Sequence, residues 1–376
     1  MEAKSWVSGK VFPSEKPLIN VSQAAPVDPP PEALRRVMAD AALNNQDAHL
    51  YGPVLGLPAL REQIARDWSR AYQGEITPDQ VAVTSGCNQA YCAAIATSAA
   101  AGDNVILVAP WYFNHKMWLD MMGIGAKVLE VGADMLPDPA RAAALIDGKT
   151  RAMVLVSPNN PSGAEYPADL LRDFLDLARD RTLTLIVDET YRDFDSREGP
   201  VHGLFSDLDW ADHFVHLYSF SKAFRLTGHR VGAMLGSVAR LAEAEKFLDT
   251  VTISPSQIGQ IAALYGLQNL GHWLEEERQE ILRRKAAIQR ELKNLPDWSL
   301  LGAGAYFAYV RYPFDLPSSE IARKLVDQAH VLALPGAMFT LPEHAQNDRH
   351  LRLAFANIDA AGIKRLGERL KAFSPV

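Results

Sequence analysis

The chain has few cysteines and no long apolar run. Its 376 residues include two cysteines, Cys87 and Cys92, close together in one expected helix, so the disulfide framework of a small secreted domain is excluded. No segment approaches the roughly 20 consecutive apolar residues that cross a bilayer. The opening residues, "MEAKSWVSGK", lack the apolar stretch of a signal peptide. We therefore expect a cytoplasmic protein with no membrane partner.

An excess of positive charge is missing as well. The 38 Lys and Arg residues against 45 Asp and Glu residues give a net charge of −7, which argues against nucleic acid as the main partner. A hydrophobic content of 48% with 22% charged residues is ordinary for a globular protein. The length exceeds the size at which one core stops growing, so it predicts two lobes.

What the sequence does contain is an alternation of short apolar runs and helical patterns. The runs lie at 80–84, 104–109, 152–156, 183–187 and 214–218, and 230–235 predicts one more strand. Helical patterns such as 167–180 separate several of them. Continuous apolar runs between helices favour an α/β fold, with a mostly parallel sheet covered on both faces.

The two ends of the chain have a different pattern. Residues 1–30 are loop-like, and a long charged helix is expected from about 272, followed by strands at 305–312 and 350–357 and helices at 319–328 and 359–373. We predict a large domain over 46–271. A smaller α+β domain would combine the N-terminal segment 1–45 with residues 272–376.

Polar groups follow four of the predicted strands. The segments are "SGCNQAY", "SPNNPSG", "DETY" and "SFSK", and ligands of open α/β sheets bind at the carboxyl ends of strands. Taken singly, each has a structural interpretation: Lys222 as a solvated loop lysine, Asp188 as a helix cap, "SPNNPSG" as a turn. His213 and His216 in "HFVH" would point to opposite faces of a strand, so they predict no metal site.

Taken together, these groups match the requirements of pyridoxal 5'-phosphate. The Lys222 amine can bond to its aldehyde, and an acid can keep its pyridine nitrogen protonated. A hydroxyl, the Arg230 guanidinium and the backbone N–H groups of a helix start can bind its phosphate. The sequence therefore predicts this cofactor at the strand ends.

Seven motifs in order resemble the class I and II aminotransferases, a family of fold-type-I pyridoxal-phosphate enzymes. They are "YGPVLGLPALREQIA", "SPNNPSG", "DETY", "SFSKAFRLTGHRVG", "GAYFAYV", "LPGAMF" and "LRLAFA", and they span nearly the whole chain. The resemblance implies a seven-stranded, mostly parallel sheet and a small domain built from both chain ends. It also implies a ping-pong transfer of an amino group between an amino acid and a 2-oxo acid.

The resemblance also assigns roles around the cofactor ring. Lys222 matches the lysine that forms the Schiff base and then moves the proton as general base and acid. Asp188 matches the partner of the pyridine nitrogen. Tyr191 and Asn160 match the pair that hydrogen-bonds the phenolic oxygen, and Tyr112 lies where family members stack an aromatic ring on the cofactor.

Further matches concern the phosphate and the second subunit. Ser219 and Arg230 match phosphate ligands, helped by the backbone amides of Gly86, Cys87 and Asn88. Cys87 could instead have a lowered thiol pKa at its helix start, although the backbone role is favoured. Tyr51 matches a tyrosine that reaches the neighbouring subunit's phosphate, which implies a homodimer with shared sites.

On the substrate side, Arg352 matches the arginine that binds the α-carboxylate. Two positions depart from the family pattern: Ala24 replaces a glycine whose amide faces the substrate, and His229 replaces a bulky aromatic residue. The aromatic residues Trp111, Tyr112, Phe113 and Trp118 hint at an apolar substrate side chain, although core packing explains them equally well.

Two alternatives remain open at this stage. A carbon–sulfur β-lyase on the same scaffold would share the early chemistry, so motifs barely separate it from an aminotransferase. A transcription regulator would use the fold as a ligand sensor. It would need a DNA-binding domain before the region of resemblance, which begins near residue 17.

Overall fold

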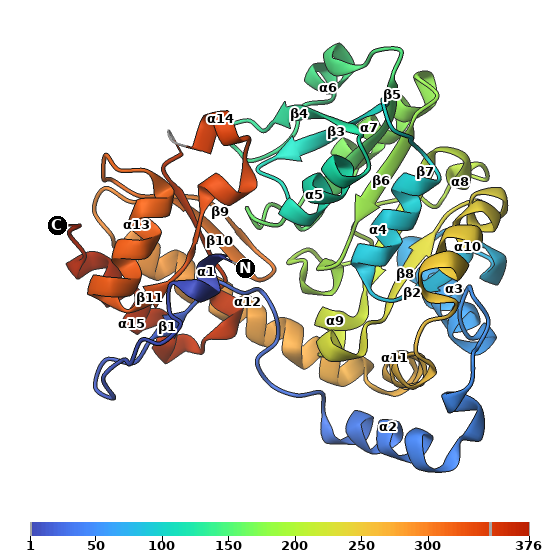
Figure 1. Cartoon of the computed structure of the whole chain (residues 1–376), viewed down its shortest axis with the longest axis horizontal. Helices are drawn as coiled ribbons and strands as arrows, with labels where there is room; N and C mark the ends of the chain where they lie inside the picture. Colours follow the sequence, from blue (N-terminus) through green and yellow to red (C-terminus); the bar gives the residue numbers. More distant parts are fainter. Residues whose placement is uncertain (1, 346–347, 376) are drawn as a thin grey trace.

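A seven-stranded sheet forms the centre of the chain in the computed structural model, which describes residues 2–345 and 348–375 (Figure 1). In spatial order its strands are β2 (Val81–Thr84), β8 (Gly232–Leu235), β7 (Phe214–Ser219), β6 (Thr184–Asp188), β5 (Thr150–Val156), β3 (Asn104–Ala109) and β4 (Gly125–Glu130). Within this sheet β8 runs antiparallel to both of its neighbours, and the pairs from β7 to β4 are parallel. The predicted α/β fold is confirmed.

Two layers of helices explain why the central strands are apolar on both faces. Residues of α3 (Pro58–Tyr72), α7 (Ala168–Asp180) and α11 (Gln257–Asn269) share one core with the sheet. Residues of α4 (Cys87–Ala96), α5 (Phe113–Met121) and α10 (Val238–Thr252) share the core on the other face. Shorter helices complete this domain: α6 (Pro139–Leu145), α8 (Trp210–His213) and α9 (Phe220–Ala223).

The edge strand β4 was not among the apolar runs picked out by the pattern. Its residues Gly125 and Glu130 are exposed and Lys127 is half-buried, because the strand has a neighbour on one side alone. An edge strand with one polar face gives no continuous apolar run. The other strands of the sheet were predicted to within about two residues at their ends.

The second domain has its own sheet and its own core. Its antiparallel sheet has the order β12 (Leu334–Pro335), β13 (His350–Leu353), β10 (Phe307–Arg311) and β9 (Ser299–Gly304). A short parallel pair joins the two chain ends, because β1 (Ile19–Asn20) lies beside β11 (Val331–Leu332). The helices are α1 (Glu2–Ser5), α12 (Gly271–Lys293), α13 (Ser318–Lys324), α14 (Pro342–Ala345) and α15 (Ala360–Ala372).

The helix α2 (Glu32–Asn44) belongs with the large domain by its packing. Leu34 and Met38 are buried in the core that α3 and α11 share with the central sheet. The predicted segment 1–45 had assigned these residues to the small domain, so we propose to place that boundary ahead of α2. The long helix α12 connects the two domains (Figure 1), and Leu274 near its start contacts both cores. Among the described residues, no helix is long and apolar enough to cross a membrane.

Candidate active site

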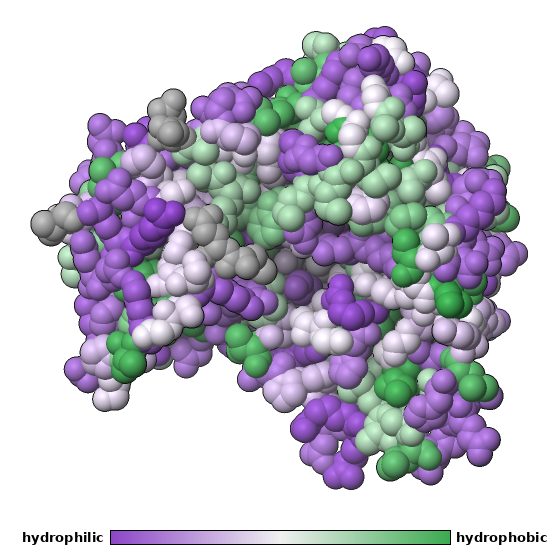
Figure 2. All heavy atoms as spheres, in the orientation of Figure 1, coloured by the Kyte–Doolittle hydropathy of each residue, from purple (hydrophilic) through white to green (hydrophobic). Residues whose placement is uncertain are grey.

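A cavity of about 450 Å³ lies at the carboxyl ends of β5, β6 and β7, with β13 and the N-terminal segment on its other side. Figure 2 shows the surface hollowed between the two domains on this face. A volume of this size suits a small-molecule ligand. The lining includes Ala24, Cys87, Asn88, Tyr112, Asn160, Asp188, Tyr191, Ser219, Lys222, Arg230 and Arg352.

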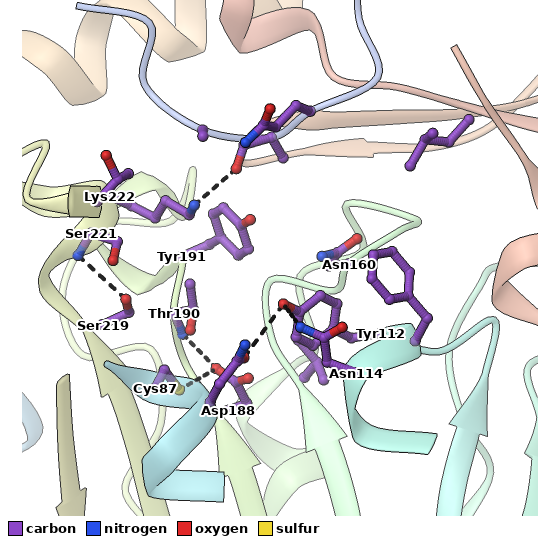
Figure 3. A pocket seen from close by; sticks show the side chains of 18 of the residues that line it. Cys87, Tyr112, Asn114, Asn160, Asp188, Thr190, Tyr191, Ser219, Ser221 and Lys222 are labelled. Atoms are coloured by element: carbon purple, nitrogen blue, oxygen red, sulfur yellow. Dashed lines mark hydrogen bonds between the residues drawn. The ribbon is translucent and has the colours of Figure 1, made fainter. Parts of the chain in front are cut away.

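Lys222 enters the cavity from the short helix α9. The Ser219 side chain caps α9 by accepting a hydrogen bond of 3.3 Å from the Ser221 N–H. Lys222 Nζ donates to the Ala24 carbonyl oxygen at 2.8 Å, which joins the large domain to the N-terminal segment (Figure 3). Burial lowers the pKa of Lys222 to about 8, and the neighbouring Arg230 and Arg352 act in the same direction. A neutral amine, the nucleophilic form, is therefore accessible near neutral pH.

Asp188 is a buried carboxylate at the end of β6. Its Oδ1 accepts the Thr190 N–H at 3.0 Å and the Cys87 thiol at 3.5 Å, and its Oδ2 lies 3.3 Å from Nε2 of His115 (Figure 3 shows the first two). Burial alone would raise the pKa of Asp188, but His115 and Thr190 outweigh it and lower that pKa. The carboxylate is therefore held ionised.

Arg230 and Gly86 form an anion-binding corner. Gly86 has a φ of +87° and precedes the first residue of α4, and a Cβ built on it would lie 2.2 Å from Nη2 of Arg230. Arg230 itself has a left-handed backbone with φ of 53°, and its Nη1 donates to the Thr227 carbonyl oxygen at 3.0 Å. Glycine is needed here because the guanidinium occupies the space of a side chain. The free N–H groups of the α4 start and this guanidinium suit a phosphate.

Arg352 reaches the cavity from β13 of the small domain. Its Nη1 donates to Oδ1 of Asn160 at 2.9 Å, its Nη2 donates to the Ser22 carbonyl oxygen, and its Nε has no partner among the described residues. The guanidinium carbon lies 5.1 Å from each of the ring centroids of Phe307 and Phe339. Burial lowers the pKa of Arg352 to about 10. A buried guanidinium with an unpartnered N–H suits an incoming carboxylate.

Tyr112 forms part of the cavity wall near Asp188. Its hydroxyl donates to Oδ1 of Asn88 at 3.4 Å and accepts from Nδ2 of Asn114 at 2.7 Å (Figure 3). Burial raises the pKa of Tyr112 to about 12, so the phenol stays neutral. Its ring meets that of His115 edge-on, with 5.1 Å between the centroids. The ring is thereby fixed beside the cavity.

The predicted residues outside the cavity lining are Gly86 and Tyr51. Gly86 lies behind Arg230, whereas Tyr51 is 79% exposed. Ala24 does line the cavity, and the contact that it makes there is through its carbonyl oxygen to Lys222. His229, in the turn η4 (Thr227–His229), is not part of the described lining.

The aromatic cluster divides between the core and the cavity. Trp111 and Trp118 pack into the core between α4, α5 and α10, so for these two residues the interpretation as core packing is correct. Phe113 and Tyr112 line the cavity.

Sequence reasoning missed His115, the partner of Asp188. Its ring stacks on Tyr91 with 3.9 Å between centroids, and both side chains are buried. One signal was present, because His115 follows Tyr112 by three residues at the start of a helix, and residues at that spacing share a helix face. Nothing in the local pattern showed that this face meets the end of β6.

The group of side chains gathered here fits pyridoxal phosphate. The cavity brings together an amine, a buried carboxylate, an anion-binding corner in which Gly86 leaves room for Arg230, and a guanidinium with a free N–H. Fold and site thus define a pyridoxal-phosphate enzyme of the type that acts on amino acids.

Comparison with known proteins identifies the family. Residues 16–370 match the family described as aminotransferase class I and II, so the chain belongs to that family and is a pyridoxal-phosphate-dependent amino-acid aminotransferase. The chain is 28% identical to an aromatic aminotransferase of Arabidopsis thaliana, with 91% of this chain and 86% of that protein covered. It is also 28% identical to the aspartate aminotransferase of Thermotoga maritima, with 94% and 89% covered.

Solved structures agree with this assignment. The crystal structure of the Thermotoga maritima aspartate aminotransferase matches with a TM-score of 0.88 at 25% identity, covering 99% of this chain and 94% of that one. The Thermus thermophilus aspartate aminotransferase with maleate matches with a TM-score of 0.87 at 25% identity, covering 95% and 92%. The predicted fold, cofactor and enzyme class are therefore confirmed.

Proposed function

We propose that Lys222 is the residue that bonds the cofactor and moves the proton at the substrate Cα. The observation that carries this proposal is the lowered pKa of its amine, about 8, in the cavity that also holds Asp188 and Arg352. Bound pyridoxal phosphate supplies an aldehyde for the substrate amine and a ring that accepts electrons. The Lys222 amine would take the proton from Cα and return it during transfer of the amino group.

The other side chains bind and orient. Asp188 holds a proton on the pyridine nitrogen, which a carboxylate kept ionised by His115 can do. Ser219, Arg230 and the amides of Cys87 and Asn88 at the α4 start bind the phosphate. The Gly86 amide, which was predicted to join them, instead donates to the Thr84 carbonyl oxygen at 2.8 Å. Tyr112 packs on the ring, Tyr191 and Asn160 bond the phenolic oxygen, and Arg352 binds the substrate carboxylate.

Borohydride labelling tests the assignment of Lys222. Reduction of the protein with its cofactor should fix the label on the peptide that contains Lys222, and the Lys222→Ala variant should bind cofactor without being labelled. Turnover in that variant should fall by more than the roughly 10²–10⁴-fold typical of acid–base catalysis, because covalent exchange is lost as well. A label on another lysine would refute the assignment. Pyruvate and ammonia formed without a 2-oxo acid acceptor would indicate β-elimination instead.

We propose that the amino donor has an apolar side chain, because several of the remaining residues that line the cavity are apolar. Ala3, Phe113, Met117 and Leu334 line the cavity together with the polar Asn114 and Lys4. Among the cationic residues in the described lining, Lys222, Arg230 and Arg352 have the roles given above. The exposed Lys4 is left to bind the side-chain carboxylate of an acidic substrate such as aspartate. One positive group exposed to water binds an anion weakly.

A panel of amino donors with 2-oxoglutarate, pyruvate and oxaloacetate tests this preference. Aromatic and large aliphatic donors should have higher kcat/KM than aspartate, and Lys4→Ala should leave that order unchanged. The relatives include both aspartate and aromatic aminotransferases, so either result is chemically open to this family. A preference for aspartate that Lys4→Ala abolishes would contradict the proposal and assign the second carboxylate to Lys4.

We propose a homodimer in which Tyr51 completes the partner's active site. Tyr51 and Leu50 are exposed by 79% and 66%, beside the exposed Leu43 at the end of α2. The segment after α10 lies against the same region, because Ser254 Oγ accepts a hydrogen bond from the Gly52 N–H at 3.2 Å. This apolar surface also includes the exposed Val251 and Ile253. Apolar groups gathered in this way mark an interface between subunits.

Mixing Lys222→Ala with Tyr51→Ala, at a cofactor concentration too low to fill the Tyr51→Ala site, tests whether the sites are shared. If each site takes Lys222 from one subunit and Tyr51 from the other, a mixed dimer of Lys222→Ala and Tyr51→Ala subunits contains one intact site. Random reassembly of equal amounts makes half of the dimers mixed, so about a quarter of the wild-type activity should return. No gain over the separate variants, or a monomer by sedimentation, would refute the proposal.

We also propose a cytoplasmic location, which fractionation of the source cells tests.

A further inference from the structure

The residue next to Asp188 is the centre of a second buried polar cluster. Asp188 faces the cavity, whereas the following Glu189 turns its carboxylate away from it, to the space beneath α3. Glu189 is 2% exposed, and the two histidines beside it, His202 and His216, are 1% and 0% exposed. None of the three lines the cavity, and the proposed mechanism uses none of them. A buried, ionised group with several partners needs an explanation, because burial of a charge is costly.

Three side chains surround the Glu189 carboxylate. The Tyr72 hydroxyl of α3 donates to Oε2, and His216 Nε2 of β7 lies 2.8 Å from the same oxygen. His202 Nε2 lies 3.2 Å from Oε1. The second ring nitrogen of His202 accepts the Leu204 N–H at 3.2 Å, so a neutral His202 carries its proton on Nε2, toward the carboxylate.

The charges in the cluster favour an ionised Glu189. Burial alone would raise the pKa of Glu189, but His202 and His216 outweigh it and lower that pKa well below its usual value. Burial lowers the pKa of His216, so this imidazole stays neutral. The nearby Arg192 guanidinium lies 3.7 Å from the ring centroid of Trp68 and donates to the Tyr72 hydroxyl at 3.4 Å.

Glu189 connects the cluster to the turn that carries the two cofactor-facing side chains, because its carboxylate lies in the cluster and its backbone bonds within and beside the turn. The Glu189 N–H donates to the Leu217 carbonyl oxygen at 2.9 Å, and the Glu189 carbonyl oxygen accepts the Arg192 N–H at 3.1 Å. Asp188 and Tyr191 lie within this turn of five residues and point into the cavity (Figure 3). The turn is therefore anchored on the far side from the cavity.

We propose that Glu189 is a positioning residue, which with Tyr72, His202 and His216 fixes the turn so that Asp188 and Tyr191 face the cofactor. The inference rests on the proposed roles of Asp188 and Tyr191. A carboxylate suits this place because the Tyr72 hydroxyl donates to it and His202 turns its Nε2 proton toward it. In Glu189→Gln an NH₂ group replaces one oxygen, and where it faces the proton of His202 Nε2 or of the Tyr72 hydroxyl the turn shifts to separate them.

The test compares Glu189→Gln with Asp195→Asn. Asp195 is a buried carboxylate as well, 2% exposed, bonded to Arg197 and outside the turn. Each variant is purified, its melting is followed by circular dichroism without cofactor, and the visible absorbance with cofactor is titrated with pH. The midpoint of that titration reports the proton affinity of the cofactor where it lies beside Tyr191 and Asp188.

Glu189→Gln should move the midpoint by about 0.5 pH unit or more. It should lower kcat about 10-fold or more with KM for the amino donor changed by less than about 3-fold. Asp195→Asn should melt at a lower temperature and keep the wild-type midpoint. His216→Leu, which removes one of the three neighbours of the Glu189 carboxylate, should shift the midpoint less in the same direction, and it replaces Glu189→Gln should that variant fail to fold.

Two results would overturn the inference: a wild-type midpoint and kcat in Glu189→Gln and His216→Leu, or an equal shift in Asp195→Asn. The wild-type protein with its cofactor must first show a visible absorbance that changes with pH, and the borohydride label must lie on Lys222. Failure at that earlier step would refute the proposed roles of the cavity residues, and so is distinct from failure of the Glu189 cluster.

Discussion

Replacing Gly86 with alanine tests the anion-binding corner most directly. Gly86 combines a φ of +87° with close contact to Arg230, since an added Cβ would lie 2.2 Å from Nη2. Gly102 provides the matched control, with a φ of +90° and nothing within 4 Å of its added Cβ. Both substitutions put a side chain on a residue with positive φ, which costs about 1–3 kcal/mol. Of the two, Gly86→Ala alone also displaces a guanidinium.

The expected size of the effect follows from what moves. The atom in the way is the end of a flexible side chain, so Arg230 should rotate away while α4 stays in place. Loss of one hydrogen bond to a charged group costs about 1.5–3 kcal/mol. That corresponds to cofactor binding weaker by roughly 10–100-fold.

Titration of the cofactor-free proteins with pyridoxal phosphate measures this loss, and thermal melting measures the strain. Both variants should melt at similarly lowered temperatures. Gly86→Ala alone should bind the cofactor more weakly, and Arg230→Ala should reproduce its loss. If Gly86→Ala binds as tightly as Gly102→Ala, Arg230 does not hold the phosphate and the proposed corner is wrong.

Three further predictions concern single cavity side chains. Asp188→Asn should still bind cofactor but lose activity by about 100-fold or more, because a neutral amide cannot hold the ring proton; near-normal turnover would assign that role to another group. Arg352→Lys should impair the half-reaction with every amino acid, since the lysine ammonium cannot replace the two parallel N–H groups with which a guanidinium binds a carboxylate. An effect on some substrates alone would place Arg352 in a side-chain pocket. The folded state lowers the pKa of Lys222 from 10.5 to about 8, so the unfolded chain binds more protons between those values. Cofactor-free Lys222→Met should therefore exceed the wild type in unfolding free energy at pH 7 by about 3 kcal/mol, a gap that should shrink as the pH rises from 8 to 10.5 in urea titrations.

The sequence predicts most of the fold because its strands are buried on both faces. The run "NVILVA" predicts β3 with its first and last residues correct, since a strand covered by two helical layers must be apolar throughout. The antiparallel direction of β8 could not be read, because direction depends on how the chain returns to the sheet. The placement of α2 could not be read either, since an amphipathic helix shows which face is buried but not against which partner.

The candidate site was predictable where chemistry follows directly after a strand. Asp188 and Lys222 come at or just after strand ends, and Arg352 lies on a strand. His115 and Glu189 escaped notice for the same physical reason. Each acts through contacts with segments distant in the chain, β6 for His115 and α3 and β7 for Glu189. Local spacing carries no record of such contacts.

The hydrogen bond of 2.9 Å from Arg352 to Asn160 joins the small domain to the large one before any substrate arrives. A carboxylate that binds Nη1 as well as the unpartnered Nε competes there with the Asn160 oxygen, and every amino acid and 2-oxo acid brings the same carboxylate. The free energy of breaking this bond is therefore common to both half-reactions. It weakens all substrates equally and cancels from the ratio of their affinities, so discrimination between substrates has to come from their side chains.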